Sequence, residues 1–330
     1  MMKPMTSIPI ATVDSRPIKI GVSSCIIGEE VRWNGGHARH RWLTDVLLEF
    51  VDFVPVCPEV DVGMGTPRPT VRLERHGSEI RLIDPKNEID WTAAMNRLSR
   101  TKASEMETHD LCGFVLKKGS PTCGLERVKV VHEGGGGASR DGQGLFASAL
   151  VHRFPHLPIE EEGRLNDPQI RENFIERVFA FRRVKDVFKS QWTLGDIVSF
   201  HTTEKLLLRA HDEVRYRELG LLVANSKAIP RGAFKDHYMD LYMAALRRRA
   251  TVAKHVNVLQ HMVAFLRWVD DEAGRAEMQE AIEGFRAGLV PLIVPTTLIR
   301  HLAKRHDQRI LLESSYLNPH PKELMLRNHA

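Results

Sequence analysis

The first half of the chain alternates short apolar runs with segments of helical periodicity. Apolar runs predict strands in IKIGV, FVPV, IRLID, GFVL and ERVKVV, which begin at Ile18, Phe53, Ile80, Gly113 and Glu126. Helical spacing predicts helices in LTDVLLEF and between Asn87 and Met106. Strands that alternate with helices are typical of a parallel sheet covered by helices. The pattern therefore predicts an α/β, Rossmann-like domain with a mostly parallel sheet.

The pattern changes after Trp192, where strand signals become sparse and apolar residues recur at helical spacing. A long amphipathic helix is predicted just before this change, at residues 170–189. We therefore expect a flexible N-terminus over residues 1–17, the α/β domain over 18–189 and an all-α domain over 190–330. The glycine-rich segment 134–144 has neither the Walker lysine pattern nor the GxGxxG spacing, so it predicts a mobile surface loop.

Composition limits the class of protein. With 330 residues and 42% hydrophobic content, the chain is long and apolar enough to fold around one or two cores. No apolar run reaches the roughly eighteen residues needed to cross a bilayer, and the first residues lack the pattern of a signal peptide. We expect a cytoplasmic protein without a membrane partner, whose oligomeric state the sequence leaves open.

Charge adds a candidate partner. The formal net charge is +5 at pH 7, and basic proteins gain affinity for nucleic acids by displacing counterions from phosphates. In the helical half, candidate phosphate-binding residues for tRNA are Arg247, Arg248, Arg249 and Lys254, and tyrosines suited to base stacking are Tyr216, Tyr238, Tyr242 and Tyr316. The alternative is a solvated helix face with tyrosines in the core, and the pattern does not decide between the two.

All four cysteines lie in the first half of the chain. Disulfides are rare in a reducing cytosol, so clustered cysteines are candidate metal ligands, although a free cysteine is often a small buried side chain. Cys25, Cys57 and Cys123 each follow a predicted strand, at the sheet edge where ligands bind in α/β folds. Cys112 precedes its strand, and we interpret it as structural. Three thiolates suit either zinc with a bound water or a 4Fe–4S cluster with one open iron, and their spacing does not distinguish the two.

Three segments carry a resemblance to a known family. They are VSSCIIGEEVRWNGGHAR, PVCPEVDVGMGTPRPTVRL and GFVLKKGSPTCGLERVKVV, and each contains one of the three candidate ligands in a distinctive setting. These segments resemble the signature sequences of the TudS-type thiouracil desulfidase domain, over about residues 18–189. The helical remainder, which includes HDEVRYRELG and SYLNPHPKELMLRNH, is similar to the second domain of the RudS-type tRNA 4-thiouridine desulfidases.

This resemblance implies roles for particular residues. It implies a 4Fe–4S cluster held by Cys25, Cys57 and Cys123, and a reaction without redox change. Glu59 matches the family's catalytic carboxylate, acting on the attacking water or on a ring proton, and Ser120 matches the serine that orients water or substrate. The alternatives are local: Glu59 caps the turn after Pro58, and Ser120 begins an SPT turn. Arg32 and Arg68 lie in the same segments and are candidates for the substrate's phosphate or ribose, with surface ion pairs as the alternative.

The sequence thus leads to one main functional hypothesis and two alternatives. The main hypothesis is a desulfidase that converts 4-thiouridine in tRNA to uridine and releases sulfide, with the α/β domain doing the chemistry and the helical domain binding tRNA. In the first alternative, free thiouracil or a thionucleotide is the substrate and the helical half mediates oligomerisation. The second is a zinc- or cluster-stabilised nucleic-acid-binding protein without turnover.

Overall fold

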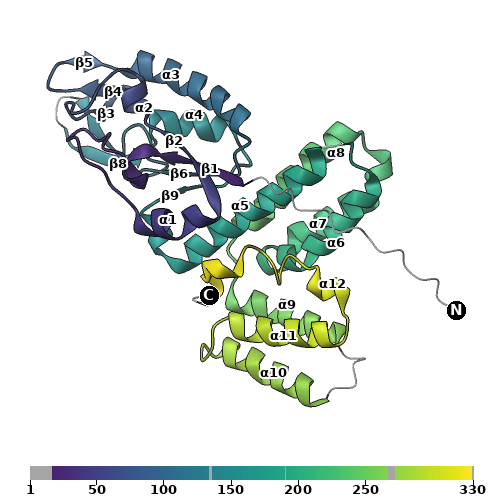
Figure 1. Cartoon of the computed structure of the whole chain (residues 1–330). Helices are drawn as coiled ribbons and strands as arrows, with labels where there is room; N and C mark the ends of the chain where they lie inside the picture. The colour runs from purple at the N-terminus through teal and green to yellow at the C-terminus, as the bar shows by residue number, and fades with distance from the viewer. Residues whose placement is uncertain (1–16, 134–135, 190, 267–271, 329–330) are drawn as a thin grey trace. The chain divides into compact units, whose positions relative to one another are not determined.

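The computed structural model describes residues 17–133, 136–189, 191–266 and 272–328, and its elements are drawn in Figure 1. The expected flexible N-terminus at 1–17 lies almost wholly outside the described residues. The chain divides into two compact units, an α/β unit that ends at Asp167 and a helical unit that begins at Pro168. The fold class therefore agrees with the one predicted: an α/β domain followed by an all-α domain.

A parallel sheet forms the centre of the α/β unit. Its strands are β1 (Ile18–Ser23), β2 (Val51–Val56), β6 (Gly113–Leu116) and β9 (Ile159–Glu161). They pair in the order β2-β1-β6-β9, and every pair is parallel. Apolar side chains of the central strands, such as Ile20 and Phe114, are fully buried. Burial on both faces explains why β6 is the continuous apolar run GFVL and why only Lys19 interrupts the run IKIGV in β1.

A second sheet of mixed direction departs from the expected single parallel sheet. Its strands are β3 (Arg72–His76), β4 (Glu79–Asp84), β5 (Ile89–Asp90), β7 (Val128–His132) and β8 (Ala138–Gly142), in the order β5-β4-β3-β7-β8. Only β3 and β7 pair in parallel. The reason lies in the connection between β3 and β4: Gly77 and Ser78 form a two-residue turn with Gly77 at a φ of +59°, and such a turn joins antiparallel strands.

The glycine-rich segment is not the loop that its composition predicted. Residues 134–135 lie outside the described residues, but Ala138–Gly142 forms β8, which pairs antiparallel with β7. Glycine permits this pairing, because a Cβ added at Gly142 would lie 2.6 Å from the side chain of Val130 and 2.9 Å from the backbone oxygen of Val128. The prediction of a mobile loop is therefore wrong for residues 138–142.

Helices cover the parallel sheet, with α3 and α4 on one side and α1 on the other (Figure 1). The helices and 3₁₀ turns of this unit are η1 (Ser24–Ile27), α1 (Arg41–Asp45), η2 (Leu47–Glu49), α2 (Pro58–Asp61), α3 (Thr92–Glu105), η3 (Met106–His109), α4 (Leu145–Arg153) and η5 (Arg164–Asn166). The two short elements that matter for the site are η1 and α2, because each starts immediately after a strand of the parallel sheet.

The helical unit contains eight α-helices among its described residues. They are α5 (Pro168–Lys189), α6 (Leu194–His211), α7 (Glu213–Ala224), α8 (Arg231–Arg247), α9 (Val252–Phe265), α10 (Glu272–Arg286), α11 (Ile293–Arg305) and α12 (Arg309–Leu312). Three 3₁₀ turns accompany them: η6 (Ser226–Ala228), η7 (Lys322–Leu324) and η8 (Leu326–Asn328). No helix in the described ranges has an apolar stretch long enough to cross a bilayer.

The first helix of this unit, α5, moves the domain boundary relative to the one expected at residues 189/190. Ala180, Val184 and Phe188 on α5 belong to the hydrophobic core of the helical unit. Because α5 buries its apolar face there, the compact units separate between Asp167 and Pro168.

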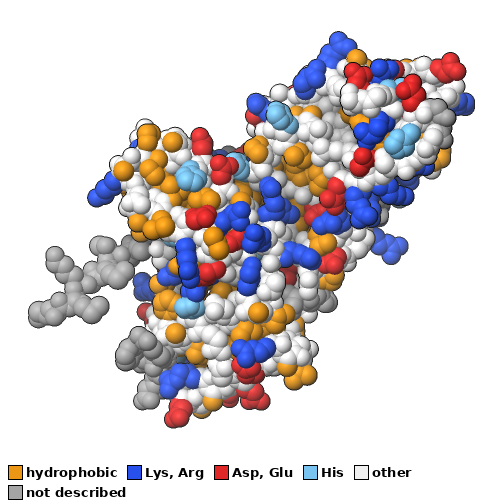
Figure 2. Space-filling model, turned by 180° about the vertical axis from the view of Figure 1, so that it is seen from behind, with side chains coloured by type: hydrophobic (Ala, Val, Ile, Leu, Met, Phe, Trp, Pro, Cys, Tyr) orange, Lys and Arg blue, Asp and Glu red, His pale blue; other side chains and the backbone are white. Residues whose placement is uncertain are grey.

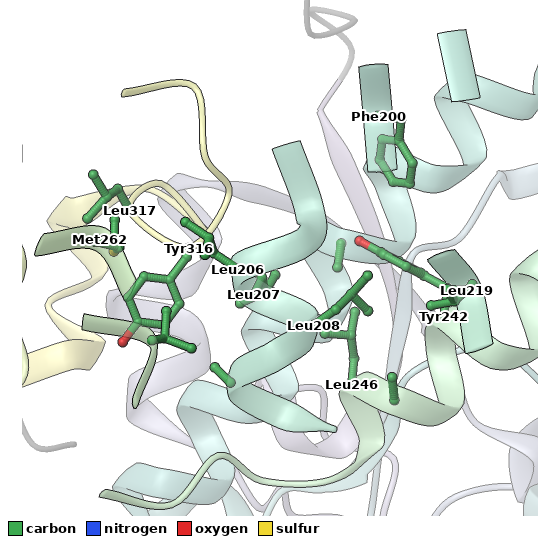
Figure 3. Close-up of a cluster of buried hydrophobic side chains, with 14 of the residues drawn as sticks. Phe200, Leu206, Leu207, Leu208, Leu219, Tyr242, Leu246, Met262, Tyr316 and Leu317 are labelled. Carbon is green, nitrogen blue, oxygen red and sulfur yellow. The ribbon is translucent and has the colours of Figure 1, made fainter. Parts of the chain in front are cut away.

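The tyrosines proposed for base stacking lie inside the helical core. Tyr238, Tyr242 and Tyr316 have no exposed surface, and Figure 3 shows Tyr242 and Tyr316 among the buried leucines. Their hydroxyls have internal partners: that of Tyr242 donates to Glu204 at 2.7 Å, and that of Tyr316 lies 2.9 Å from His255 Nδ1. The stacking interpretation is therefore wrong for these three residues, which fill the core as large side chains with satisfied hydroxyls.

Candidate metal centre and its surroundings

Three of the four cysteines follow neighbouring strands of the parallel sheet. Cys25 lies in η1 directly after β1, Cys57 is the residue between β2 and α2, and Cys123 lies in the turn after β6. Since β2, β1 and β6 are adjacent and parallel, their carboxyl ends share one edge of the sheet. After β1 the chain first forms β2 on one side of β1 and later forms β6 on the other side. The point where the strand order reverses in this way is the switch point, where α/β folds bind ligands.

Cys112 lies at the opposite end of its strand, as the sequence indicated. It is fully buried immediately before β6, and its backbone N–H donates to Lys19 near the start of β1 at 2.8 Å. Its thiol points to a backbone oxygen, that of Asp110, at 3.8 Å. This position separates Cys112 from the edge where the other three cysteines lie.

The three thiols are electrostatically coupled through Cys57; Cys123 is buried, whereas Cys25 and Cys57 are partly exposed. Burial raises the pKa of Cys25 to about 11 and that of Cys123 to about 12, and it also raises the pKa of Cys57. A negative charge on Cys57 raises the pKa of both other thiols, so the three side chains are within electrostatic reach of one another. Thiols in such a site stay neutral unless a positive centre stabilises the thiolates, as a bound metal does.

Positive side chains act on two of the thiols: Lys117 and Arg32 lower the pKa of Cys25 against the effect of burial, and Arg68 does the same for Cys57. Lys117 itself forms an ion pair with Glu162. Arg32 is half-buried, and it follows Val31, whose carbonyl faces the thiol of Cys57 at 3.9 Å. The proposed substrate residue Arg32 is therefore close to the cysteine edge.

Glu59 lies beside the cysteines and is held from two sides. Its Oε2 accepts hydrogen bonds from Arg68, whose Nε is 3.0 Å away and whose Nη2 forms an ion pair with the same oxygen. Its Oε1 accepts a hydrogen bond from Thr122 Oγ1 at 2.8 Å, with Ser120 Oγ at 3.4 Å. The charge of Glu59 raises the pKa of both Cys57 and Cys123. The carboxylate is thus fixed next to two of the three candidate ligands.

Ser120 organises the turn that carries Cys123. Its Oγ accepts the backbone N–H groups of Thr122 at 3.2 Å and Cys123 at 3.1 Å, and it lies 2.9 Å from Thr122 Oγ1. Such short side-chain-to-backbone bonds are typical of serine at the start of a turn. Ser120 therefore combines the local role that its SPT sequence indicates with a position facing Glu59.

Arg68 is buried, with its side chain 3% exposed. Besides Glu59, its guanidinium donates to the carbonyl oxygens of Val31 at 2.9 Å and Gly65 at 2.8 Å. A guanidinium presents five N–H donors in a rigid fork, and here that fork joins the Glu59 turn to the loop around Val31. The sequence indicated Arg68 as a substrate ligand, whereas its contacts in the structure are with the protein around Glu59.

Thr122 is a site residue that sequence reasoning missed. It is fully buried, and its hydroxyl bonds to Glu59 and lies 3.7 Å from the sulfur of Cys123. Its place between Ser120 and Cys123 in the segment SPTC was the available signal, but a threonine in a turn has many local explanations. Only the fold shows that its side chain points to a carboxylate 63 residues earlier in the chain.

Among the residues that the structure describes, no three His, Cys, Asp or Glu side chains are grouped as ligands of a single metal ion. A 4Fe–4S cluster does not need ligands grouped around one ion, because each cysteine binds a different iron atom of the cluster.

The candidate tRNA-binding residues lie where α8 ends and α9 begins. Arg247, Arg248 and Arg249 are exposed, and Arg248 forms an ion pair with Asp212 at 3.2 Å. Lys254 is half-buried and donates to the carbonyl oxygen of His211 at 2.5 Å. On the face of the molecule drawn in Figure 2, Lys and Arg side chains gather near the centre, with Asp, Glu and His side chains among them.

The sequence profile of the 2-thiouracil desulfurase family matches residues 20–162, a range that contains all three edge cysteines, Glu59 and Ser120. The Bacillus subtilis protein YbbK is 30% identical over 109 residues, which are 31% of this chain and 71% of that protein. The chain belongs to the 2-thiouracil desulfurase family.

Three further similarities accompany the desulfurase match. The solved structure of TudS, a [4Fe-4S]-dependent thiouracil desulfidase, is 28% identical, with a TM-score of 0.36, covering 46% of this chain and 94% of that one. The Escherichia coli protein YbgA is 26% identical over 168 residues, which are 50% of this chain and 98% of that protein. Beyond the desulfurase region, residues 205–321 match a family of unknown function, DUF1722. In this desulfurase-family chain, two family profiles thus match separate parts of the sequence.

Proposed function

We propose that this chain is a desulfidase that removes sulfur from thiolated uracil, with 4-thiouridine in tRNA as its substrate and a 4Fe–4S cluster as its cofactor. The observation that carries the proposal is the edge of the parallel sheet, where Cys25, Cys57 and Cys123 follow three adjacent strands beside a fixed carboxylate. Membership of the 2-thiouracil desulfurase family supports the reaction class.

The donor set fits such a cluster. Cys57 raises the pKa of both other thiols, and the cationic side chains Lys117 and Arg32 act on Cys25, which suits an anionic thiolate cluster. Cys25, Cys57 and Cys123 would hold three irons. When bound, a cluster with three protein ligands supplies an open iron, a soft Lewis acid suited to the sulfur of a thiocarbonyl.

The chain's own residues would handle water and protons. The reaction replaces sulfur by oxygen: a C–O bond forms from water, the C–S bond breaks, sulfur leaves as sulfide, and no electrons are gained or lost. Glu59 would accept a proton from the attacking water or carry it to the ring nitrogen. Arg68 and Thr122 hold the two oxygens of Glu59 in place, and the hydroxyl of Ser120 lies on the Oε1 side, where it would orient water or substrate.

The helical unit would supply affinity for the nucleic acid. Three exposed arginines in sequence, Arg247 to Arg249, with Lys254 nearby, suit contact with several phosphates. Such contacts act on capture of tRNA rather than on the bond-breaking step. Free thiouracil or a thionucleotide would need only the α/β unit, so the choice of substrate depends on the helical unit.

The experiment compares substrates. The protein is purified without oxygen, and sulfide release is measured with thiolated tRNA and with 4-thiouridine monophosphate at matched concentrations. A tRNA desulfidase releases sulfide from tRNA with the higher kcat/KM. A higher kcat/KM for the free nucleotide would assign the reaction to small thiolated substrates. If the protein binds tRNA but releases sulfide from neither substrate, the desulfidase proposal is wrong and a nucleic-acid-binding protein without turnover becomes the better explanation.

A further inference from the structure

A pocket of about 570 Å³ is lined by residues of the helical unit, none of which is assigned to the reaction. It is bounded by α5, the segment that joins α8 to α9, the start of α9, and α10. Its walls include Glu172, Glu176, His211, Arg249, Lys254 and Phe285. Its volume falls within the range of roughly 300–1,000 Å³ usual for small-molecule sites.

Three positive side chains are among the residues that line this pocket. Arg248 and Arg249 are exposed and line it, and Lys254 lies in the first turn of α9. Arg249 forms no ion pair with any residue that the structure describes, whereas Arg248 is paired with Asp212. The N-terminus of α9 adds backbone donors, because the first N–H groups of a helix have no partner within it, and the hydroxyl of Thr251 accepts only the N–H of Lys254 among them.

The acidic side chains of the pocket are neutralised by partners of their own. Glu176 accepts hydrogen bonds from Arg327 Nη2 at 3.0 Å and bonds to His211 Nε2 at 3.1 Å. Glu172 lies 3.4 Å from the guanidinium of the same buried Arg327. Burial and the neighbouring Glu176 also raise the pKa of Glu172 to about 7. The carboxylates therefore oppose an anion much less than their number suggests, and the exposed Arg248 and Arg249 favour one.

The remaining walls suit the rest of a nucleotide. Phe285 offers an apolar surface, and its ring meets His255 edge to face with centroids 6.1 Å apart. Asn173 also lines the pocket, and it donates its amide N–H to the carbonyl of Leu246 at 3.0 Å, so its amide oxygen remains able to accept a hydrogen bond. An apolar wall with a few polar groups is the usual composition of a site for a small ligand.

We propose that this pocket binds a nucleotide through its phosphate, with the phosphate between Arg249, Arg248 and the N-terminus of α9. The proposal rests on the proposed function, since it gives the helical unit one defined phosphate site in place of a general basic surface. Two sources share this chemistry: a nucleotide of the bound RNA, and a free nucleotide.

The test measures binding of AMP and of inorganic phosphate to the full-length, cluster-containing protein by calorimetry. AMP is chosen because its base is not a uracil, which keeps the reaction site out of the measurement. Arg249→Gln should weaken binding of both probes by roughly ten- to a hundredfold, the loss expected for a hydrogen bond to a charged group. Arg247→Gln is the matched control. It removes the same charge at a position two residues earlier, and the Arg247 side chain does not line the pocket.

Competition then separates the two sources. If tRNA displaces AMP, the pocket holds a nucleotide of the RNA; if AMP stays bound beside tRNA, the pocket holds a free nucleotide. The proposed phosphate site would be wrong if neither probe binds, or if Arg249→Gln and Arg247→Gln lose affinity for the probes equally. Sulfide release from thiolated tRNA by the same preparations shows independently whether the proposed reaction holds.

Discussion

The two oxygens of Glu59 have different partners, and this asymmetry is the main feature of the site at the scale of single residues. Arg68 binds one oxygen, and Thr122 with Ser120 binds the other. A carboxylate held on both sides keeps one geometry, which a group that acts on a positioned water requires.

Replacing Glu59 by Gln should leave the iron content unchanged, because Glu59 is not one of the three cysteine ligands proposed for the cluster. Turnover should fall by about 10²–10⁴-fold, the usual contribution of a general acid or base. Iron content and the rate of sulfide release, measured on one preparation, check this. Asp61→Asn is the control, since Asp61 lies on the same short helix but pairs with Lys102 at 3.7 Å. Near-normal turnover in Glu59→Gln would mean that another group moves the proton.

Replacing Cys25, Cys57 or Cys123 by Ser should abolish iron retention, because three anchors leave no spare ligand. Cys112→Ser should retain iron, since Cys112 lies at the other end of its strand. Iron analysis and visible absorption after anaerobic purification distinguish these outcomes. Loss of iron in Cys112→Ser with retention in Cys123→Ser would contradict the assignment of the third ligand.

The role of an individual side chain could be predicted from the sequence when its residue type has few roles in proteins. It was less predictable when the residue type has many roles. Cysteines after strands indicated the sheet edge, and the structure puts Cys25, Cys57 and Cys123 there. Arg68 suits a phosphate or an ion pair equally, and only the fold decides which neighbour its side chain meets.

At the scale of elements, the turn from Ser120 to Gly124 positions both a hydroxyl and a sulfur. Its tightness depends on Gly124, because a Cβ there would lie 2.7 Å from the backbone oxygen of Ser120 and 2.4 Å from Val128. The sequence predicted the strand before this turn from its apolar run. It did not predict β8 or the antiparallel pairs, because Ala138–Gly142 has no apolar alternation and gains its structure by pairing with β7.

Gly124→Ala should therefore disturb the turn. We expect a loss of about 1–3 kcal/mol in the free energy of unfolding, as for other overpacked sites, together with a lower iron content. Gly136→Ala is the control, since an added Cβ at Gly136 meets no atom within 4 Å. Chemical denaturation and iron analysis of both variants provide the measurement, and equal behaviour of the two would show that the turn tolerates a side chain.

At the scale of the whole molecule, the chain joins a unit for chemistry to a helical unit with exposed cations. The sequence predicted this division because helical periodicity replaces strand signals after Trp192. It misplaced the boundary because the amphipathic pattern of α5 does not reveal which core receives its apolar face. The tyrosine positions were ambiguous for the same reason, since a core tyrosine and a stacking tyrosine look alike in sequence.

Changing Arg247, Arg248 and Arg249 together to Gln should weaken tRNA binding and reduce its salt dependence. The log–log slope should fall by roughly 0.7–0.9 for each phosphate that the variant no longer neutralises. Sulfide release from a free thionucleotide should stay unchanged, because these residues lie in the helical unit. Affinity titrations at several salt concentrations measure the slope. An unaltered slope, or an equal loss on both substrates, would remove the tRNA-binding role from this segment.

The central claim is that cluster-dependent desulfidation takes place on the cysteine edge of the α/β unit. The most direct test follows conversion of 4-thiouridine in tRNA to uridine, with sulfide released, by one preparation in three states: as purified without oxygen, after removal of iron by a chelator, and after reconstitution with iron and sulfide. The account predicts one sulfide per uridine formed, loss of activity with the iron, and recovery on reconstitution. Full activity of the iron-free protein, or a reconstituted protein that forms no uridine, would contradict it.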